Sequence, residues 1–196
     1  DKSLGRILDE LDRTGQAQNT HVVFSSDHGD LLGDHGMWWK SLVCYDESIK
    51  VPMIARYPGQ IPGGKRSRAF QNLVDLFPTF CDFAQTTVPY DCEGISQRAV
   101  WEGSATKLRD DVIVEERPAD SAFNERILVD DQYKLAFYAG RDYGELYDVN
   151  ADPNHIHNLW NSPQHQAVKQ RMIARILSHE MNKAVPTPGP SRLARK

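Results

Sequence analysis

The sequence has 196 residues, of which 40% are hydrophobic and 26% are charged, and these fractions are typical of a globular protein. The net charge of −4 and the lack of a basic stripe argue against a nucleic-acid partner, and no apolar run is long enough to span a membrane. Three cysteines without a C-x-x-C pair favour free thiols over a disulfide framework or a structural zinc site.

The first residues predict an amphipathic helix between Asp1 and Gln16. Its apolar residues recur at helical spacing, and Gly15 is suited to end it: Leu4, Ile7, Leu8 and Leu11. The chain begins in or just before this helix, without an initiating methionine or a signal peptide, so we expect a C-terminal fragment of a longer protein. The sequence therefore does not specify a location, cytoplasmic or periplasmic.

The next stretch places polar chemistry at the end of a strand. His21–Ser25 is a short apolar run that suits a buried parallel strand, and Asp27 and His28 follow at its C-terminal edge, where ligands bind in open α/β sheets. An ionised Asp and a neutral His can both coordinate a divalent cation, and Gly29 tolerates backbone angles that would let adjacent residues share one ion. The alternative is a strand-ending turn. The density of the residues that follow favours a functional loop: Asp30, Gly33, Asp34, His35, Gly36, Trp38, Trp39 and Lys40.

The middle of the chain alternates short elements and turns. Residues 41–50 suit a short helical turn, Val51–Tyr57 a strand, and the residues from Asn72 a helix that is kinked at Pro78 or begins there. Residues 85–107 have the composition of irregular structure. We therefore expect one domain over residues 1–106 and a boundary near residue 107.

The second domain is predicted over residues 107–185 as an antiparallel sheet that is covered by a helix. Turn residues separate its strand candidates: Val112–Glu115, Arg126–Val129, Tyr133–Tyr138 and Glu145–Asp148. The covering helix spans about Pro163–Lys183, with Ser162 as its N-cap. The proline-rich and basic residues 186–196 are expected to form a flexible tail.

Several blocks, in this order, carry a resemblance to a known family: Ser-Asp-His-Gly at 26–29, Gly-Asp-His-Gly at 33–36, Lys40, Tyr-Asp-Glu-Ser at 45–48, Val-Pro-Met-Ile at 51–54, Tyr-Pro-Gly at 57–59, Val-Asp-Leu-Phe-Pro-Thr at 74–79 and Glu-Leu-Tyr-Asp at 145–148. The chain resembles the C-terminal portion of a type I sulfatase, similar to the arylsulfatases and choline-sulfatases of the alkaline phosphatase superfamily. The resemblance implies an α/β fold, in which part of an alkaline-phosphatase-like sandwich with a mostly parallel sheet precedes a small antiparallel sheet packed on a helix.

The resemblance also implies roles for individual residues. Asp27 and His28 would be metal ligands, and Lys40 would contact the sulfate and the leaving oxygen. His35 would contact the substrate or fix the loop by a hydrogen bond. The cation would be Ca²⁺, with Mn²⁺, Mg²⁺ or Zn²⁺ as alternatives on ligand type.

The nucleophile that the family requires is not in this sequence. Family members take it from C-x-P-x-R, where the cysteine is oxidised to formylglycine, or from S-x-P-x-R, and the surroundings of Cys44, Cys81 and Cys92 do not fit this motif. We therefore expect formylglycine in an N-terminal half that this chain lacks, and we expect the chain alone to be inactive.

Three functions stay open from the sequence. The first is metal-assisted hydrolysis of a small-molecule sulfate ester. The second is hydrolysis of a phosphonate or phosphate ester, because many sulfatases have Asn where this chain has His28. The third is a non-catalytic fragment or interaction module. Uncovered strand edges would favour a homo-oligomer or association with the N-terminal half.

Overall fold

The computed structural model describes residues 1–88, 92–118 and 123–183. The chain divides into two compact units. The first comprises residues 1–41, 46–69 and 98–108, and the second comprises residues 42–45, 70–97 and those from 109 onward. The predicted boundaries at residues 106 and 185 stay predictions, and the expected tail lies outside the described residues.

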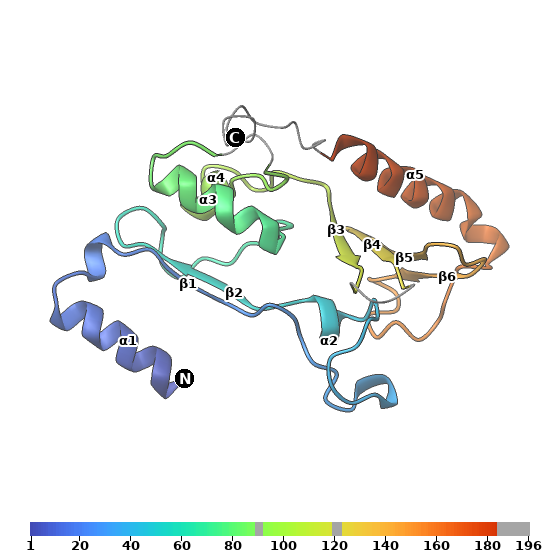
Figure 1. The fold of residues 1–196 in the computed structure, drawn as a ribbon, viewed down its shortest axis with the longest axis horizontal. Helices are drawn as coiled ribbons and strands as arrows, with labels where there is room; N and C mark the ends of the chain where they lie inside the picture. Colours follow the sequence, from blue (N-terminus) through green and yellow to red (C-terminus); the bar gives the residue numbers. More distant parts are fainter. Residues whose placement is uncertain (89–91, 119–122, 184–196) are drawn as a thin grey trace, which may run out of the picture. The chain divides into compact units, whose positions relative to one another are not determined.

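The first unit consists of short helices and strands, of which only some were predicted from the sequence (Figure 1). They are α1 (Lys2–Arg13), the 3₁₀ helix η1 (Ala17–Asn19), β1 (Val22–Ser25), the 3₁₀ helix η2 (Asp34–Gly36), α2 (Asp46–Ile49), β2 (Met53–Arg56) and α4 (Arg98–Glu102). After α1, Gly15 adopts a φ of 70°, so the glycine that was expected to end the helix is the residue with the required left-handed backbone.

The pairing of β1 differs from the expectation of a buried parallel strand. Within the described residues, β1 pairs with β2, and the two strands run antiparallel, with Val22 opposite Arg56 and Ser25 opposite Met53. Phe24 and Ile54 lie opposite each other and are exposed. The prediction was wrong because a four-residue apolar run indicates a strand but carries no information about its partner or its depth.

Helix α4 lies in a region that was expected to be irregular. It is only five residues long, yet it buries Val100 and Trp101, and an ion pair between Arg98 Nε and Glu102 Oε1 at 2.7 Å joins its first and last residues. A helix of five residues is too short to show helical periodicity in a sequence. Burial of two large side chains therefore stabilises a helix that local pattern does not predict.

The second unit is built on a four-stranded antiparallel sheet in the order β3-β4-β5-β6 (Figure 1). Its elements are the 3₁₀ helix η3 (Leu73–Asp75), α3 (Leu76–Phe83), β3 (Asp111–Glu116), β4 (Glu125–Asp130), β5 (Tyr133–Tyr138), β6 (Gly144–Asp148), the 3₁₀ helix η4 (Pro163–His165) and α5 (Gln166–Asn182). Pro78 falls in the first turn of α3, where the helix tolerates its missing N–H. The four predicted strands are confirmed.

Helix α5 covers one face of this sheet, as the sequence predicted. Ser162 precedes Pro163 as the N-cap residue of η4, and α5 itself begins at Gln166 with His165 as its N-cap, so the helix starts later than predicted. The apolar stripe of α5 packs on β4 and β5. The buried cluster consists of Leu128, Leu135, Leu146, Trp160, Met172 and Ile176. The alternation of side chains along each strand therefore separates this apolar face from a second, more polar face.

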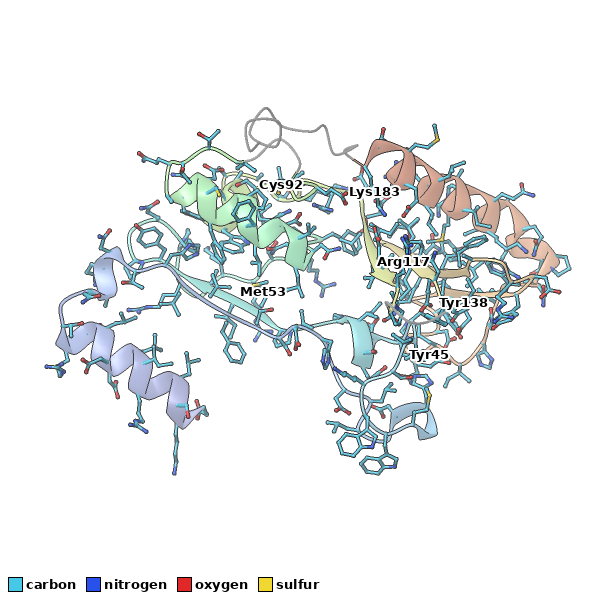
Figure 2. All side chains as sticks on the ribbon, viewed as in Figure 1. Tyr45, Met53, Cys92, Arg117, Tyr138 and Lys183 are labelled. Atoms are coloured by element: carbon cyan, nitrogen blue, oxygen red, sulfur yellow. The ribbon has the colours of Figure 1, made fainter. Side chains whose placement is uncertain are left out.

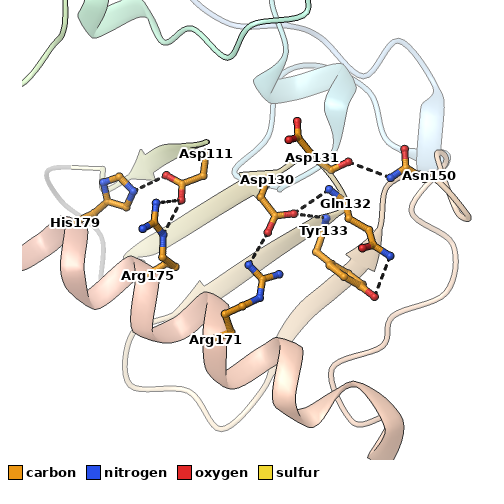
Figure 3. Close-up of polar contacts among 9 residues, drawn as sticks. All are labelled: Asp111, Asp130, Asp131, Gln132, Tyr133, Asn150, Arg171, Arg175 and His179. Atoms are coloured by element: carbon orange, nitrogen blue, oxygen red, sulfur yellow. Dashed lines mark hydrogen bonds and ion pairs between the residues drawn. The ribbon is translucent and has the colours of Figure 1, made fainter. Parts of the chain in front are cut away.

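Ion pairs join the same helix to the edges of the sheet (Figure 3). Asp111, which is buried at the start of β3, accepts from Arg175 Nε at 2.8 Å and lies 2.7 Å from His179 Nε2. Asp130, at the end of β4, accepts from Arg171 at 2.9 Å. These contacts fix α5 along the strands.

Asp130 also forms the turn that joins β4 to β5. Its Oδ1 accepts from the backbone N–H groups of Gln132 at 2.9 Å and of Tyr133 at 2.6 Å. Such side-chain capping of a turn is a common use of Asp.

Among the residues that the structure describes, no helix is long and apolar enough to cross a bilayer.

Candidate metal and ester site

The candidate site begins where β1 ends. The Asp27 side chain is 85% exposed, and its Oδ1 accepts from the backbone N–H of His28 at 3.0 Å. The backbone N–H groups of Asp27 and His28 hold the pKa of the Asp27 carboxyl below its usual range. This carboxylate is therefore ionised and open to solvent, as a cation ligand must be.

The His28 ring is oriented so that one nitrogen is suited to bind a cation. Nδ1 lies 2.7 Å from the carbonyl oxygen of Gly29, and Nε2 lies 3.6 Å from Asp27 Oδ2. Because a carbonyl only accepts, Nδ1 carries the hydrogen, and in the neutral ring Nε2 holds a lone pair on the side of Asp27. Metal-binding histidines are commonly oriented by such a bond from the other nitrogen. The two residues thus fit the expected cation.

Gly29 fits the loop for a reason that the sequence did not reveal. Its φ lies outside the left-handed region, so the expected role in an unusual backbone bend is wrong. Instead, a Cβ at this position would lie 1.8 Å from the carbonyl oxygen of Glu47, and the Gly29 N–H donates to the carbonyl of Ser48 at 2.8 Å. Glycine is needed here because two backbones approach closely.

The second Asp-His-Gly sequence lies in a compact loop. Leu31 is fully buried, and the loop closes through bonds from Gly33 N to Met37 O at 2.9 Å and from Leu31 N to Trp39 O at 3.4 Å. His35 has a left-handed backbone, with φ 54° and ψ 21°, and its side chain is only 14% exposed. Its Nε2 lies 3.8 Å from Glu47 Oε2. A non-glycine residue in this conformation is strained and is often found at functional sites.

The outer part of this loop is exposed. Trp38 and Trp39 are 70% and 77% exposed, and Lys40, which follows them, is exposed as well. The structure therefore brings Asp27 and His28 together, and it places His35 against Glu47 and Lys40 at the loop surface. Within the described part of the chain, no three His, Cys, Asp or Glu side chains gather as a complete metal site.

The second unit carries a buried group of ionisable side chains that sequence reasoning missed. Glu145 accepts hydrogen bonds from Tyr138 at 2.5 Å, from Tyr147, and from the Cys44 thiol at 3.6 Å. Tyr138, labelled in Figure 2, ends β5 on the sheet face opposite α5. Burial raises the pKa of Cys44, Tyr138 and Tyr147. A thiol that stays protonated is a poor nucleophile, which agrees with the failure of Cys44 to fit the family's motif.

Glu116 and Glu125 face each other across β3 and β4 on that same face of the sheet. Glu125 is fully buried, and burial together with the charge of Glu116 raises its pKa to about 8. Burial raises the pKa of Glu116 to about 7. The predicted strands stopped one residue short of this pair, because charged residues at strand ends resemble loop residues in a sequence.

Comparison with known proteins places these features in a family. Residues 33–182 match the family described as N-sulphoglucosamine sulphohydrolase, C-terminal. An N-acetylglucosamine-6-O-sulfatase of Bacteroides thetaiotaomicron is 34% identical over 184 residues, which are 90% of this chain and 33% of that protein. The chain thus spans about a third of the length of this curated relative.

Solved structures show the same similarity. One, described as a complex with its substrate D-glucosamine-2-N,6-O-disulfate, is 32% identical and superimposes with a TM-score of 0.81 over 93% of this chain and 38% of that chain. A phosphonate monoester hydrolase from Silicibacter pomeroyi is 27% identical, with a TM-score of 0.85 over 95% of this chain and 39% of that chain. The expected α/β fold of the alkaline-phosphatase-like kind is confirmed.

Proposed function

The chain belongs to the sulfatases, in the family of N-sulphoglucosamine sulphohydrolase C-terminal regions, and on this premise we propose that the protein hydrolyses a sulfate ester with the help of a divalent cation. The observation that carries the proposal is the orientation of His28. Its Nδ1–H is engaged by the Gly29 carbonyl, and its Nε2 lies beside the ionised Asp27 carboxylate. This arrangement supports the roles of Asp27 and His28 as cation ligands.

The bound cation would supply polarisation of the sulfuryl oxygens. We propose Ca²⁺, since Asp27 offers a hard oxygen ligand, and the imidazole of His28 keeps Mn²⁺, Mg²⁺ and Zn²⁺ as alternatives. Lys40 would place a positive charge near the departing oxygen, and His35 would contact the substrate. The nucleophile motif C/S-x-P-x-R is absent from these 196 residues, so we propose that the chain by itself does not turn over substrate.

A sulfated sugar is the substrate class that we propose. The relative from Bacteroides thetaiotaomicron is an N-acetylglucosamine-6-O-sulfatase, and one similar structure holds a disulfated glucosamine. The exposed Trp38 and Trp39 support this choice, because an aromatic ring offers a flat apolar surface to the C–H face of a pyranose.

A phosphonate monoester is the second candidate substrate. The similarity to the Silicibacter pomeroyi hydrolase favours it, as does a histidine at position 28.

We also propose that the chain associates with a second copy or with an N-terminal half. The exposed apolar residues Phe24 and Ile54 support this proposal.

The test uses the protein expressed from its complete reading frame, with glucosamine 6-sulfate and phenyl phosphonate monoester as alternative substrates. We expect turnover of the sulfate ester that is lost on chelation and restored by Ca²⁺. Asp27→Asn and His28→Ala should weaken Ca²⁺ binding in calorimetry, whereas Asp9→Asn, on the exposed face of α1, should not. Faster turnover of the phosphonate would favour the second candidate, and turnover of neither would refute the catalytic proposal.

A further inference from the structure

Helix α2 is in contact with three segments of the candidate site. The Ser48 carbonyl accepts from Gly29 N at 2.8 Å, the Ser48 hydroxyl donates to the Ser41 carbonyl at 2.9 Å, and the Glu47 carboxylate faces His35. All of these residues belong to the first compact unit. Helix α2 thus contacts Gly29, which follows the proposed cation ligands, Ser41, which follows Lys40, and His35.

The backbone part of this support is tight. The Glu47 carbonyl is so close to Gly29 that no Cβ fits between them, and Ser48 is only 5% exposed. A displacement of α2 would therefore move the residue that follows His28. The packing couples the position of α2 to that of the cation ligands.

The side chain of Glu47 has a different partner. Among the described residues, its Oε2 is buried without a hydrogen-bond donor, and it lies 3.8 Å from the His35 Nε2. This distance exceeds that of a hydrogen bond. Catalytic contacts are commonly long in ligand-free structures and shorten when substrate binds. A buried carboxylate oxygen favours such a partner strongly.

We propose that Glu47 is a positioning residue, which orients the His35 imidazole toward the substrate ester and links it through α2 to the cation-binding loop. The proposal rests on the proposed function, because it assigns His35 a substrate contact. Glu47 itself touches neither substrate nor cation. A carboxylate on one ring nitrogen fixes the tautomer and orientation of an imidazole, and loss of such an outer partner reduces activity by about 10- to 100-fold in other sites.

The kinetic test compares two neighbouring carboxylates of α2. Glu47→Gln keeps the shape and removes the charge that faces His35, whereas Asp46→Asn removes a charge that pairs with Lys50 at 3.5 Å. We expect Glu47→Gln to lower kcat on glucosamine 6-sulfate by about tenfold or more with little change in KM. Glu47→Asp should recover part of this loss, and Asp46→Asn should stay within about twofold of the original protein.

A double variant separates positioning from a general loss of structure. In a His35→Asn background, Glu47→Gln should cause no further loss of kcat, because the residue through which it acts is gone. Equal losses in the presence and absence of His35 would overturn the proposal. So would equal effects of Glu47→Gln and Asp46→Asn, since these would indicate a merely structural role of α2.

An NMR measurement tests the coupling between Glu47 and His35 without an activity assay. The side-chain ¹⁵N resonances of His35, assigned by their loss in His35→Asn, should shift in Glu47→Gln and not in Asp46→Asn. Unchanged His35 resonances in Glu47→Gln would overturn the proposal. A shift in a protein that hydrolyses no sulfate ester would instead support the Glu47–His35 coupling and refute the proposed function.

Discussion

The buried Glu116–Glu125 pair predicts an unusual dependence of stability on pH. Glu125 is fully buried, and its pKa of about 8 compares with 4.5 for an ordinary glutamate. The folded state therefore binds this proton more tightly than the unfolded state does. The stability that this proton provides is fully present below pH 4.5 and is lost as the pH rises through about 8.

The magnitude follows from the two pKa values. Each tenfold difference in proton affinity is worth about 1.4 kcal/mol, so the rise from 4.5 to about 8 corresponds to a change of about 5 kcal/mol in the free energy of unfolding. This change is a large part of the free energy of unfolding of a typical domain, which is roughly 5–15 kcal/mol. Replacing Glu125 by Gln keeps the shape of the protonated side chain and removes the titration.

The measurement is urea denaturation at pH 5 and pH 8.5. We expect the stability of Glu125→Gln relative to the original protein to rise by about 3–5 kcal/mol between these two pH values. The exposed Glu93→Gln serves as the control and should show no such rise. Parallel stability curves for the original protein and Glu125→Gln would refute the reasoning.

Three further predictions concern packing and reactivity. Gly29→Ala should lower the free energy of unfolding by about 1–3 kcal/mol, because its Cβ clashes with the Glu47 carbonyl. Gly5→Ala, in α1 with open space around it, should raise the free energy of unfolding by about 0.5–1 kcal/mol. Both are measured by calorimetric scans. Met172→Ala removes a fully buried side chain of α5 and should lower the free energy of unfolding by about 2–5 kcal/mol in urea denaturation. Met181 is 75% exposed, so Met181→Ala should cost less than about 0.5 kcal/mol. An equally small cost for Met172→Ala would contradict the described core. Iodoacetamide should label the partly exposed Cys92 before the buried Cys44, as read by peptide mass, and the reverse order would contradict the described burial.

The elements that the sequence predicted well are those whose pattern repeats. Helix α5 has enough turns to show its period, and Ser162 with Pro163 marks the start of η4, which leads directly into it. Alternation and turn residues likewise located β3 to β6. What failed depends on contacts between distant residues: the antiparallel partner of β1, the burial that stabilises α4, and the close approach that requires glycine at position 29.

The candidate site divides in the same way. The family motif predicted Asp27 and His28 as cation ligands, and this assignment stays a prediction; the structure adds that His28 Nδ1 lies 2.7 Å from the Gly29 carbonyl oxygen and Nε2 lies 3.6 Å from Asp27 Oδ2. Glu47 was quoted as part of a motif, but its position against His35 follows from the fold of the intervening loop. The facing of Glu116 and Glu125 depends on strand register, and a single-residue change in register would place them on different faces.

The order of the strands in the second unit has a consequence for folding kinetics. β3, β4 and β5 each pair with the strand that follows in the chain, and η4 and α5 come next after β6. The loops that must close are therefore short, and such a meander has a low contact order. We expect this region to form early as a cooperative foldon, with amides that stay protected from hydrogen exchange when β1 and β2 have already opened.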